Sequence, residues 1–270
     1  MSLTRSVSLL TLMFFAVAAL GEEAPTPPEF AATVADSVRL GNAIYRHDRA
    51  ASIATDAVLE VQRFRRDKRV QGWITQEKGS DIEVTFAGAI GDGVLEGFYR
   101  ATVPSNAMLS GSAQKLDPPQ ALGAAEIAMF NARNLALNSG FERCARTYNT
   151  VVLPDARGGE PVWAVYLLPG TDERDVIAAG GNYRVDVAYD GSKMLARRAF
   201  SKTCLMIRPE LPDGASAAAV VLRHFLDPVP TEIHVFLSLA ARTEIALSTT
   251  QNNLLWWIER GTIKYSAARR

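Results

Sequence analysis

Two of the chain's three histidines, His224 and His234, stand on either side of a loop that contains two prolines. The alternation of residues predicts a hairpin of two strands over 217–239. If this hairpin is symmetric about Val229, His224 lies directly opposite His234. Glu232 is two residues from His234 and therefore shares its face of the strand. Two imidazoles and a carboxylate on one surface form a ligand set for a divalent metal, so these three residues are the candidate metal site.

The same residues also have a structural interpretation. Cross-strand histidines often only pack or contact water, and a shift of one residue in register would separate them. A third interpretation is recognition of a ligand or partner by this surface. The sequence contains no nucleophile elbow, no His-Glu-x-x-His motif, no paired-cysteine metal spacing and no nucleotide-binding loop. We therefore predict no catalytic residue and no cofactor. A non-enzymatic protein is favoured, and a metal-dependent enzyme using His224, Glu232 and His234 is the alternative.

A basic run forms the second candidate site. Five of the seven residues from Arg63 to Arg69 are lysine or arginine. One interpretation is a patch that binds the anionic surface of the cell envelope. The other is a solvated helix end, where cations offset the partial negative charge of the helix C-terminus.

The N-terminus has the layout of a secretory signal peptide over residues 1–21. Arg5 precedes an apolar run from Val7 to Leu20, and small residues follow. The run is shorter than the ~20 residues that a membrane span requires. No second run of that length follows, so we predict an exported chain, periplasmic or secreted, with no transmembrane span in its mature form.

The charge balance argues against nucleic acid as a partner. Removal of the signal peptide takes Arg5 from the 29 basic residues and none of the 29 acidic ones, which leaves a net charge of −1. Proteins that bind nucleic acid usually carry a basic excess. We expect instead a protein, peptide or small ligand of the cell envelope as partner.

The only two cysteines, Cys144 and Cys204, are predicted to form a disulfide, because an isolated pair in an exported chain is usually oxidised. Closing a loop of this length stabilises a fold by about 4 kcal/mol on the chain-entropy model. The alternative is a reactive thiol, since Arg143 and Arg146 flank Cys144 and cations lower the pKa of a thiol.

The fold class predicted is α+β, with two long helices packed on antiparallel, meander-type sheets and a β-rich C-terminal half. A flexible segment at 22–28 precedes a helix and antiparallel strands at 29–103, in which Gly41 could divide the helix in two. Prolines, glycines and serines indicate a linker at 104–117. A second unit of helix and strands follows at 118–270.

The second helix is expected to begin at Asp117 and Pro118 and to end at Gly140. After it, alternating residues predict two hairpins and further strands. The hairpins pair Asn149–Pro154 with Val162–Leu168, and Asn182–Tyr189 with Lys193–Phe200. Later in the chain, Trp256 and Trp257 are expected on opposite faces of one strand, one in the core and the other exposed or at an interface.

The helix, the hairpin and the segment Asn182–Phe200 resemble small exported modules of the PepSY or cystatin-like kind. The whole mature chain also resembles uncharacterised exported proteins of Gram-negative bacteria. The segments that carry this likeness are Tyr148–Pro154, Trp163–Pro169 and Pro230–Phe236. Neither resemblance implies a catalytic motif.

Overall fold

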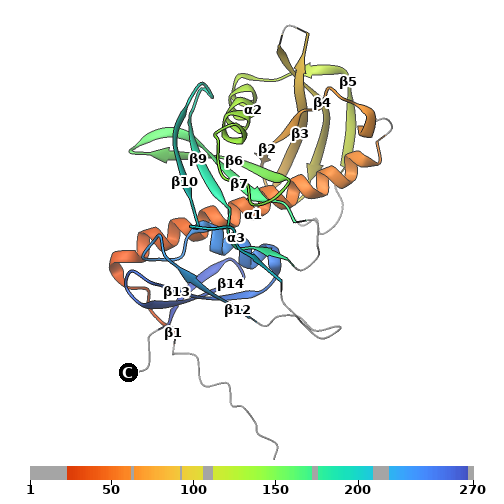
Figure 1. Cartoon of the computed structure of the whole chain (residues 1–270). Helices are drawn as coiled ribbons and strands as arrows, with labels where there is room; N and C mark the ends of the chain where they lie inside the picture. The colour runs from red at the N-terminus through yellow and green to blue at the C-terminus, as the bar shows by residue number, and fades with distance from the viewer. Residues whose placement is uncertain are drawn as a thin grey trace, which may run out of the picture.

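The computed structural model describes residues 23–61, 64–91, 93–105, 112–171, 176–208 and 219–266 (Figure 1). Its fold is α+β, as predicted. The helices in the described ranges are α1 (Ala31–Leu59), α2 (Ala124–Leu137) and α3 (Glu232–Ala241), with short 3-10 turns η1 (Pro28–Phe30) and η2 (Phe64–Arg66). The predicted signal peptide at residues 1–21 lies outside the described residues. No helix within the described ranges is long and apolar enough to cross a membrane.

The strands of the described residues form three large sheets and one short pair. The first sheet, in the order β2-β3-β4-β5, contains β2 (Gly72–Lys78), β3 (Asp81–Ile90), β4 (Val94–Val103) and β5 (Ser112–Ala121). The second sheet, in the order β10-β9-β7-β6, contains β6 (Tyr148–Arg157), β7 (Glu160–Pro169), β9 (Tyr183–Ala188) and β10 (Met194–Ala199). The third sheet, in the order β1-β15-β14-β13-β12, contains β1 (Glu23–Ala24), β12 (Ala219–His224), β13 (Glu244–Thr249), β14 (Leu254–Glu259) and β15 (Thr262–Ser266). The short pair is β8 (Ile177–Ala178) with β11 (Met206–Ile207).

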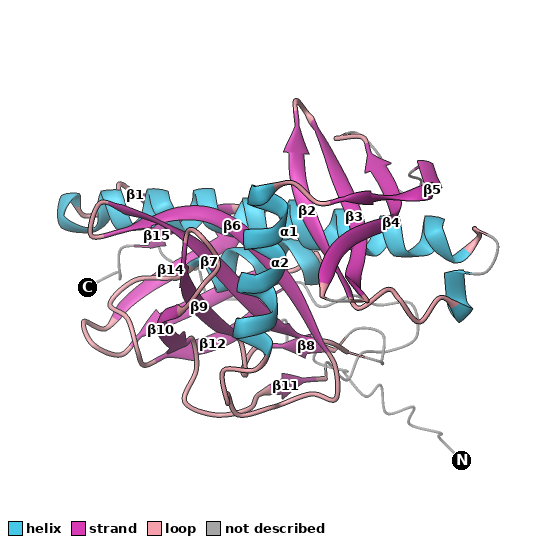
Figure 2. Ribbon diagram, turned by 90° about the horizontal axis from the view of Figure 1, so that it is seen from above, coloured by secondary structure: helices cyan, strands magenta, loops and turns pink. Residues whose placement is uncertain are grey.

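Helix α1 runs across the whole molecule, with the third sheet on one side and the other two sheets on the other (Figures 1 and 2). Its first half buries Leu40 and Ile44 in a core shared with α3 and with the second and third sheets. Its second half buries Ile53 and Val58 against the first sheet. Helix α2 covers the opposite face of the second sheet. One helix thus contributes to the burial of all three sheets.

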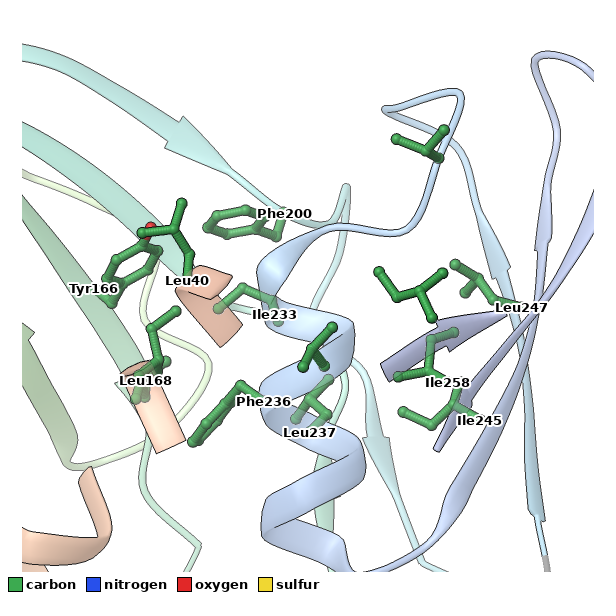
Figure 3. Close-up of a cluster of buried hydrophobic side chains, with 14 of the residues drawn as sticks. Leu40, Tyr166, Leu168, Phe200, Ile233, Phe236, Leu237, Ile245, Leu247 and Ile258 are labelled. Carbon is green, nitrogen blue, oxygen red and sulfur yellow. The ribbon is translucent and has the colours of Figure 1, made fainter. Parts of the chain in front are cut away.

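Helix α3 lies between the second and third sheets (Figure 3). Its Ile233 and Phe236 face the side of Tyr166 and Leu168, whereas Ile245 and the other strand residues of the third sheet lie on its far side. Every residue from 232 to 238 is buried. The helix therefore has no solvent-facing stripe over this stretch.

This helix corrects the prediction of a strand at residues 231–239. The alternation of Ile233, Val235 and Leu237 imitates a half-buried strand, but the residues between them are buried as well. A helix that is apolar on all sides lacks the 3.6-residue signal on which sequence assignment relies. The predicted hairpin across Val229 is therefore wrong, and β12 instead pairs in parallel with β13.

The start of the second helix is also corrected. Residues 112–121 form strand β5, so the predicted linker at 104–117 is a strand from Ser112 onward. Pro118 and Pro119 lie in this strand, which is at the edge of its sheet, where a residue without an N–H costs no ladder hydrogen bond. Helix α2 begins at Ala124, and the Gly123 amide donates to Glu126 Oε2 at 2.8 Å. That contact satisfies a donor at the helix N-terminus.

Among the described helices, α1, at 29 residues, is long, whereas α2 has 14 residues. Gly41 does not divide α1, which is continuous from Ala31 to Leu59. Its role is instead to allow close contact with α3. A Cβ atom at position 41 would lie 2.5 Å from Cβ of Val235 and 2.6 Å from the carbonyl oxygen of Glu232. The missing side chain therefore lets α3 lie directly on α1.

Several predicted features are confirmed. Cys144 and Cys204 form a disulfide, with their Cα atoms 5.3 Å apart. Strand β6 pairs with β7 and β9 with β10, as the two hairpins predicted, although the first turn is only Gly158-Gly159. Trp256 is fully buried and Trp257 partly exposed, as expected of neighbours on one strand.

The close contact at Gly41 predicts whether Gly41→Ala raises or lowers the stability of the protein. In an open helix, Gly41→Ala stabilises a protein by about 1 kcal/mol. Here the added methyl group meets the backbone of α3, so we expect destabilisation by about 1–3 kcal/mol. Urea unfolding of the variant measures this, with the exposed Ser52→Ala on the same helix as a control. A more stable Gly41→Ala variant would show that the two helices are not in close contact.

Candidate functional site

His224 and His234 contact each other, although not through the predicted hairpin. His224 is the last residue of β12 and His234 lies in the first turn of α3. Their ring centroids are 4.7 Å apart with an interplanar angle of 81°. Both side chains are buried. The sequence analysis therefore brought the right two histidines together, although it placed His234 on a strand and not on a helix.

Glu232 does not join this pair. Residues two apart on a helix point in different directions, and Glu232 Oε1 accepts a hydrogen bond from the hydroxyl of Tyr166 at 3.2 Å. Burial and the nearby Glu232 carboxylate raise the pKa of Tyr166 well above its ordinary value, so the phenol stays a donor. Within the described ranges, no group of three or more His, Cys, Asp or Glu is arranged to hold a metal ion. Metal binding at His224, Glu232 and His234 stays a prediction.

Asp227 is the carboxylate that contacts the histidine pair. Its Oδ2 lies 2.9 Å from His224 Nε2 and accepts from Arg198 Nη2 at 2.8 Å. Burial alone would raise the pKa of Asp227, but its hydrogen bond with His224 and the charge of Arg198 lower the pKa below the ordinary value. Asp227 is therefore ionised, and its charge is paired with the Arg198 guanidinium.

The tautomer of His234 follows from its N-terminal position on α3. The backbone N–H of Thr231 donates to His234 Nδ1 at 3.0 Å. Because a backbone amide can only donate, Nδ1 carries no proton. Burial, followed by the charge of His224, lowers the pKa of His234 to about 3. His234 is thus neutral at pH 7, with its proton on Nε2.

We call the cavity beside this pair the histidine pocket. It has a volume of about 330 Å³ and lies between β12, the segment that follows β10, and α3. Its lining includes Phe200, Lys202, Leu205, Leu222, Arg223, His224, Phe225 and His234.

A second, larger cavity was not predicted from the sequence. This interlayer groove, of about 490 Å³, lies where α1 meets β2, α2 and the hairpin β6–β7. Its apolar wall comprises Leu40, Ala43, Met129, Val152, Leu153 and Trp163. Residues from four regions of the chain form it, so no local pattern reveals it. The one local signal is on α1, where Arg39, Arg46 and His47 recur at helical spacing.

His47 is a buried polar group of the groove. Its Nδ1 lies 2.7 Å from Thr75 Oγ1, and its Nε2 lies 3.8 Å from a carboxylate oxygen of Glu77. Burial, only partly offset by the Glu77 charge, lowers the pKa of His47 to about 4. The imidazole is neutral at pH 7 and acts as a hydrogen-bonding group rather than a cation.

Two arginines line the groove from α1. Arg46 Nη1 lies 3.0 Å from Glu77 Oε1, and Arg39 Nη2 lies 3.7 Å from Asp155 Oδ1. The side chains of Arg39, Arg46 and Glu77 are each about half exposed. Arg39, Arg46 and Glu77 line the groove itself, whereas Asp155, the partner of Arg39, is not among its lining residues.

The basic run begins at Arg63, which lies outside the described residues. Arg65 and Arg66 form the exposed turn η2. Arg69 has a structural role, because it pairs with Asp67 at 2.6 Å and its guanidinium lies 4.4 Å from the Phe98 ring centroid. Binding of an anionic envelope surface by this run stays a prediction.

Comparison with known proteins does not identify the chain. No family model matches it, and no curated protein matches it. Among solved structures, the YpmB protein from Bacillus subtilis aligns with 54% of this chain and 95% of its own, at 13% identity and a TM-score of 0.21. An overlap this loose gives no basis for assigning fold or function, and the resemblance to PepSY or cystatin-like modules stays a prediction.

The low pKa of His47 makes a prediction about acid stability. The folded pKa, about 4, lies below the ordinary value of 6.5, so the unfolded chain binds more protons between these values. The stabilisation is present above pH 6.5 and is lost as the pH falls towards 4. We expect the stability advantage of wild type over His47→Gln to shrink by about 1–2 kcal/mol between pH 7 and pH 5.

Urea unfolding of both proteins at the two pH values measures this difference. Asp48 provides the control of opposite sign, because burial raises its pKa from 3.8 to about 6 and its contribution to stability is lost as the pH rises. Asp48→Asn should therefore gain stability relative to wild type as the pH rises from 5 to 7. Equal pH dependence of wild type and His47→Gln would contradict the burial of a neutral imidazole.

Proposed function

We propose that the chain is an exported, non-enzymatic binding protein that holds a small amphipathic anion in the interlayer groove. The observation that carries this proposal is the groove itself, where an apolar wall lies beside two half-exposed arginines. Its volume falls within the roughly 300–1,000 Å³ of typical small-molecule sites.

The apolar wall favours a ligand with a hydrocarbon or aromatic body. Met129 extends from α2, Leu40 and Ala43 from α1, and Trp163 from the second sheet. The Trp163 ring stacks on Tyr189 at a centroid distance of 4.7 Å, and its Nε1 donates to the Tyr189 carbonyl at 2.7 Å. The indole is therefore fixed in place and presents a preformed apolar surface.

The arginines favour an anionic head group. The pair of Arg46 with Glu77 is solvent-exposed, and such pairs contribute only about 0–1 kcal/mol. A ligand carboxylate can therefore replace Glu77 beside Arg46 at little cost. A bidentate contact with the guanidinium would then fix the head group.

The polar residues His47 and Thr75 of the interlayer groove support binding rather than catalysis. Thr75, the hydroxyl nearest to His47, is buried and in contact with the imidazole, so it is poorly placed to reach a substrate. A pKa of about 4 also makes His47 a weak base at neutral pH.

Two features support export. The sequence begins with the layout of a signal peptide, and the Cys144–Cys204 disulfide suits an oxidising compartment such as the periplasm. The groove's ligand is accordingly proposed to be a molecule of the cell envelope.

The fluorescent anion anilinonaphthalene sulfonate provides a test, because it combines an aromatic body with a negative charge. We expect it to bind the folded protein, and decanoate to displace it more effectively than decanol does. Ala43→Phe fills the groove and should weaken binding about tenfold. Ala35→Phe makes the same change at an exposed site on α1 and should leave affinity within about twofold.

The charge of the head group is tested separately by Arg46→Gln. This variant should lose the preference for decanoate over decanol while retaining the affinity for decanol. Equal binding by Ala43→Phe and wild type would exclude the groove as the site. Failure of the folded protein to bind any of the three probes would contradict the proposal as a whole.

A further inference from the structure

The histidine pocket has features of a second ligand site, independent of the interlayer groove. Its apolar lining includes Phe200, Leu205, Leu222 and Phe225. Leu205 is 46% exposed and Phe225 is 50% exposed. Large apolar side chains exposed beside a cavity are a recognised mark of a binding site.

The pocket is also lined by a hydrogen-bond donor of α3. Since the backbone N–H of Thr231 donates to Nδ1 of His234, the proton of the neutral ring is on Nε2. His234 lines the cavity and is more than nine-tenths buried. Its Nε2–H can therefore donate to an acceptor supplied by a ligand.

The charges around the pocket select an anion. Lys202 lines it, with its ammonium 5.7 Å from the Phe225 ring centroid, and Arg223 lines it as well. No carboxylate occurs among the described lining residues. The adjacent carboxylate, Asp227, is already paired with the Arg198 guanidinium at 2.8 Å.

We propose that the histidine pocket binds a small monocarboxylate with an aromatic or branched apolar body. The carboxylate accepts from His234 Nε2 and pairs with the Lys202 ammonium, while the body packs on Phe225, Leu205 and Leu222. The volume of about 330 Å³, near the lower limit for ligand sites, fits a single ring or a short branched chain.

Calorimetry with three ligands of similar shape tests the charge requirement. Phenylacetate should bind at least about tenfold tighter than neutral phenylacetamide or cationic phenethylamine. The Ala43→Phe background weakens any binding in the interlayer groove, so the histidine pocket can be measured separately. Phenylacetate binding should persist there, whether or not the groove binds a ligand of its own.

Variants then test the location. Leu205→Trp fills the pocket at a half-exposed position and should reduce phenylacetate affinity about tenfold. Lys202→Gln should remove most of the preference for the acid over the amide. Lys193→Gln makes the same change at an exposed lysine in the β9–β10 turn and should leave the preference intact.

A readout on His234 itself comes from long-range ¹H–¹⁵N spectra of the imidazoles. We expect the Nε2–H tautomer in the free protein and a shift of its resonance when phenylacetate is added. A proton on Nδ1, equal affinity for acid and amide, or unchanged binding by Leu205→Trp would each overturn the proposal. So would the absence of phenylacetate binding by the folded protein.

Discussion

The structure depends on the middle of α1, where residues 41–48 contact every layer of the molecule. Gly41 allows α3 to lie against the helix backbone. Asn42 Nδ2 donates to the carbonyl of Gly261, in the turn between β14 and β15 of the third sheet, at 2.7 Å. His47 contacts Thr75 of the first sheet, and Asp48 accepts from Asn149 of the second at 3.1 Å. Of these, the buried contact of His47 with Thr75 is the most costly to leave unmade, so it fixes the position of the first sheet on the helix.

This arrangement explains why both cavities occur at junctions. The interlayer groove lies beside residues 39–47, where α1 meets β2 of the first sheet, α2 and the hairpin β6–β7 of the second sheet. The histidine pocket lies where α3 and the end of β12 meet the segment after β10. Cys204 belongs to that segment, so the disulfide to Cys144 secures one wall of the histidine pocket to the region after α2. The disulfide is thus structural, while the ligand chemistry lies beside it.

The sequence predicted features that local chemistry determines. Alternating residues and glycine turns located the hairpins β6–β7 and β9–β10, and the only two cysteines implied their bond. It failed where burial is complete on all sides, as in α3, because periodicity then carries no information. It also failed at β5, where two prolines resembled a helix start but occupy an edge strand. The proximity of His224 to His234 was predicted. However, the carboxylate that contacts His224 is Asp227 and not Glu232.

The groove was beyond sequence reasoning, since its walls come from α1, β2, α2 and the second sheet. The groove forms only if α1 holds the three sheets together as one cooperative unit. Hydrogen exchange at increasing denaturant tests this most directly, because it reports the free energy of opening for each segment. We expect one shared opening free energy for α1 and the central strands of all three sheets. Opening of β3 and β4 at markedly lower denaturant, with α1 still protected, would contradict it.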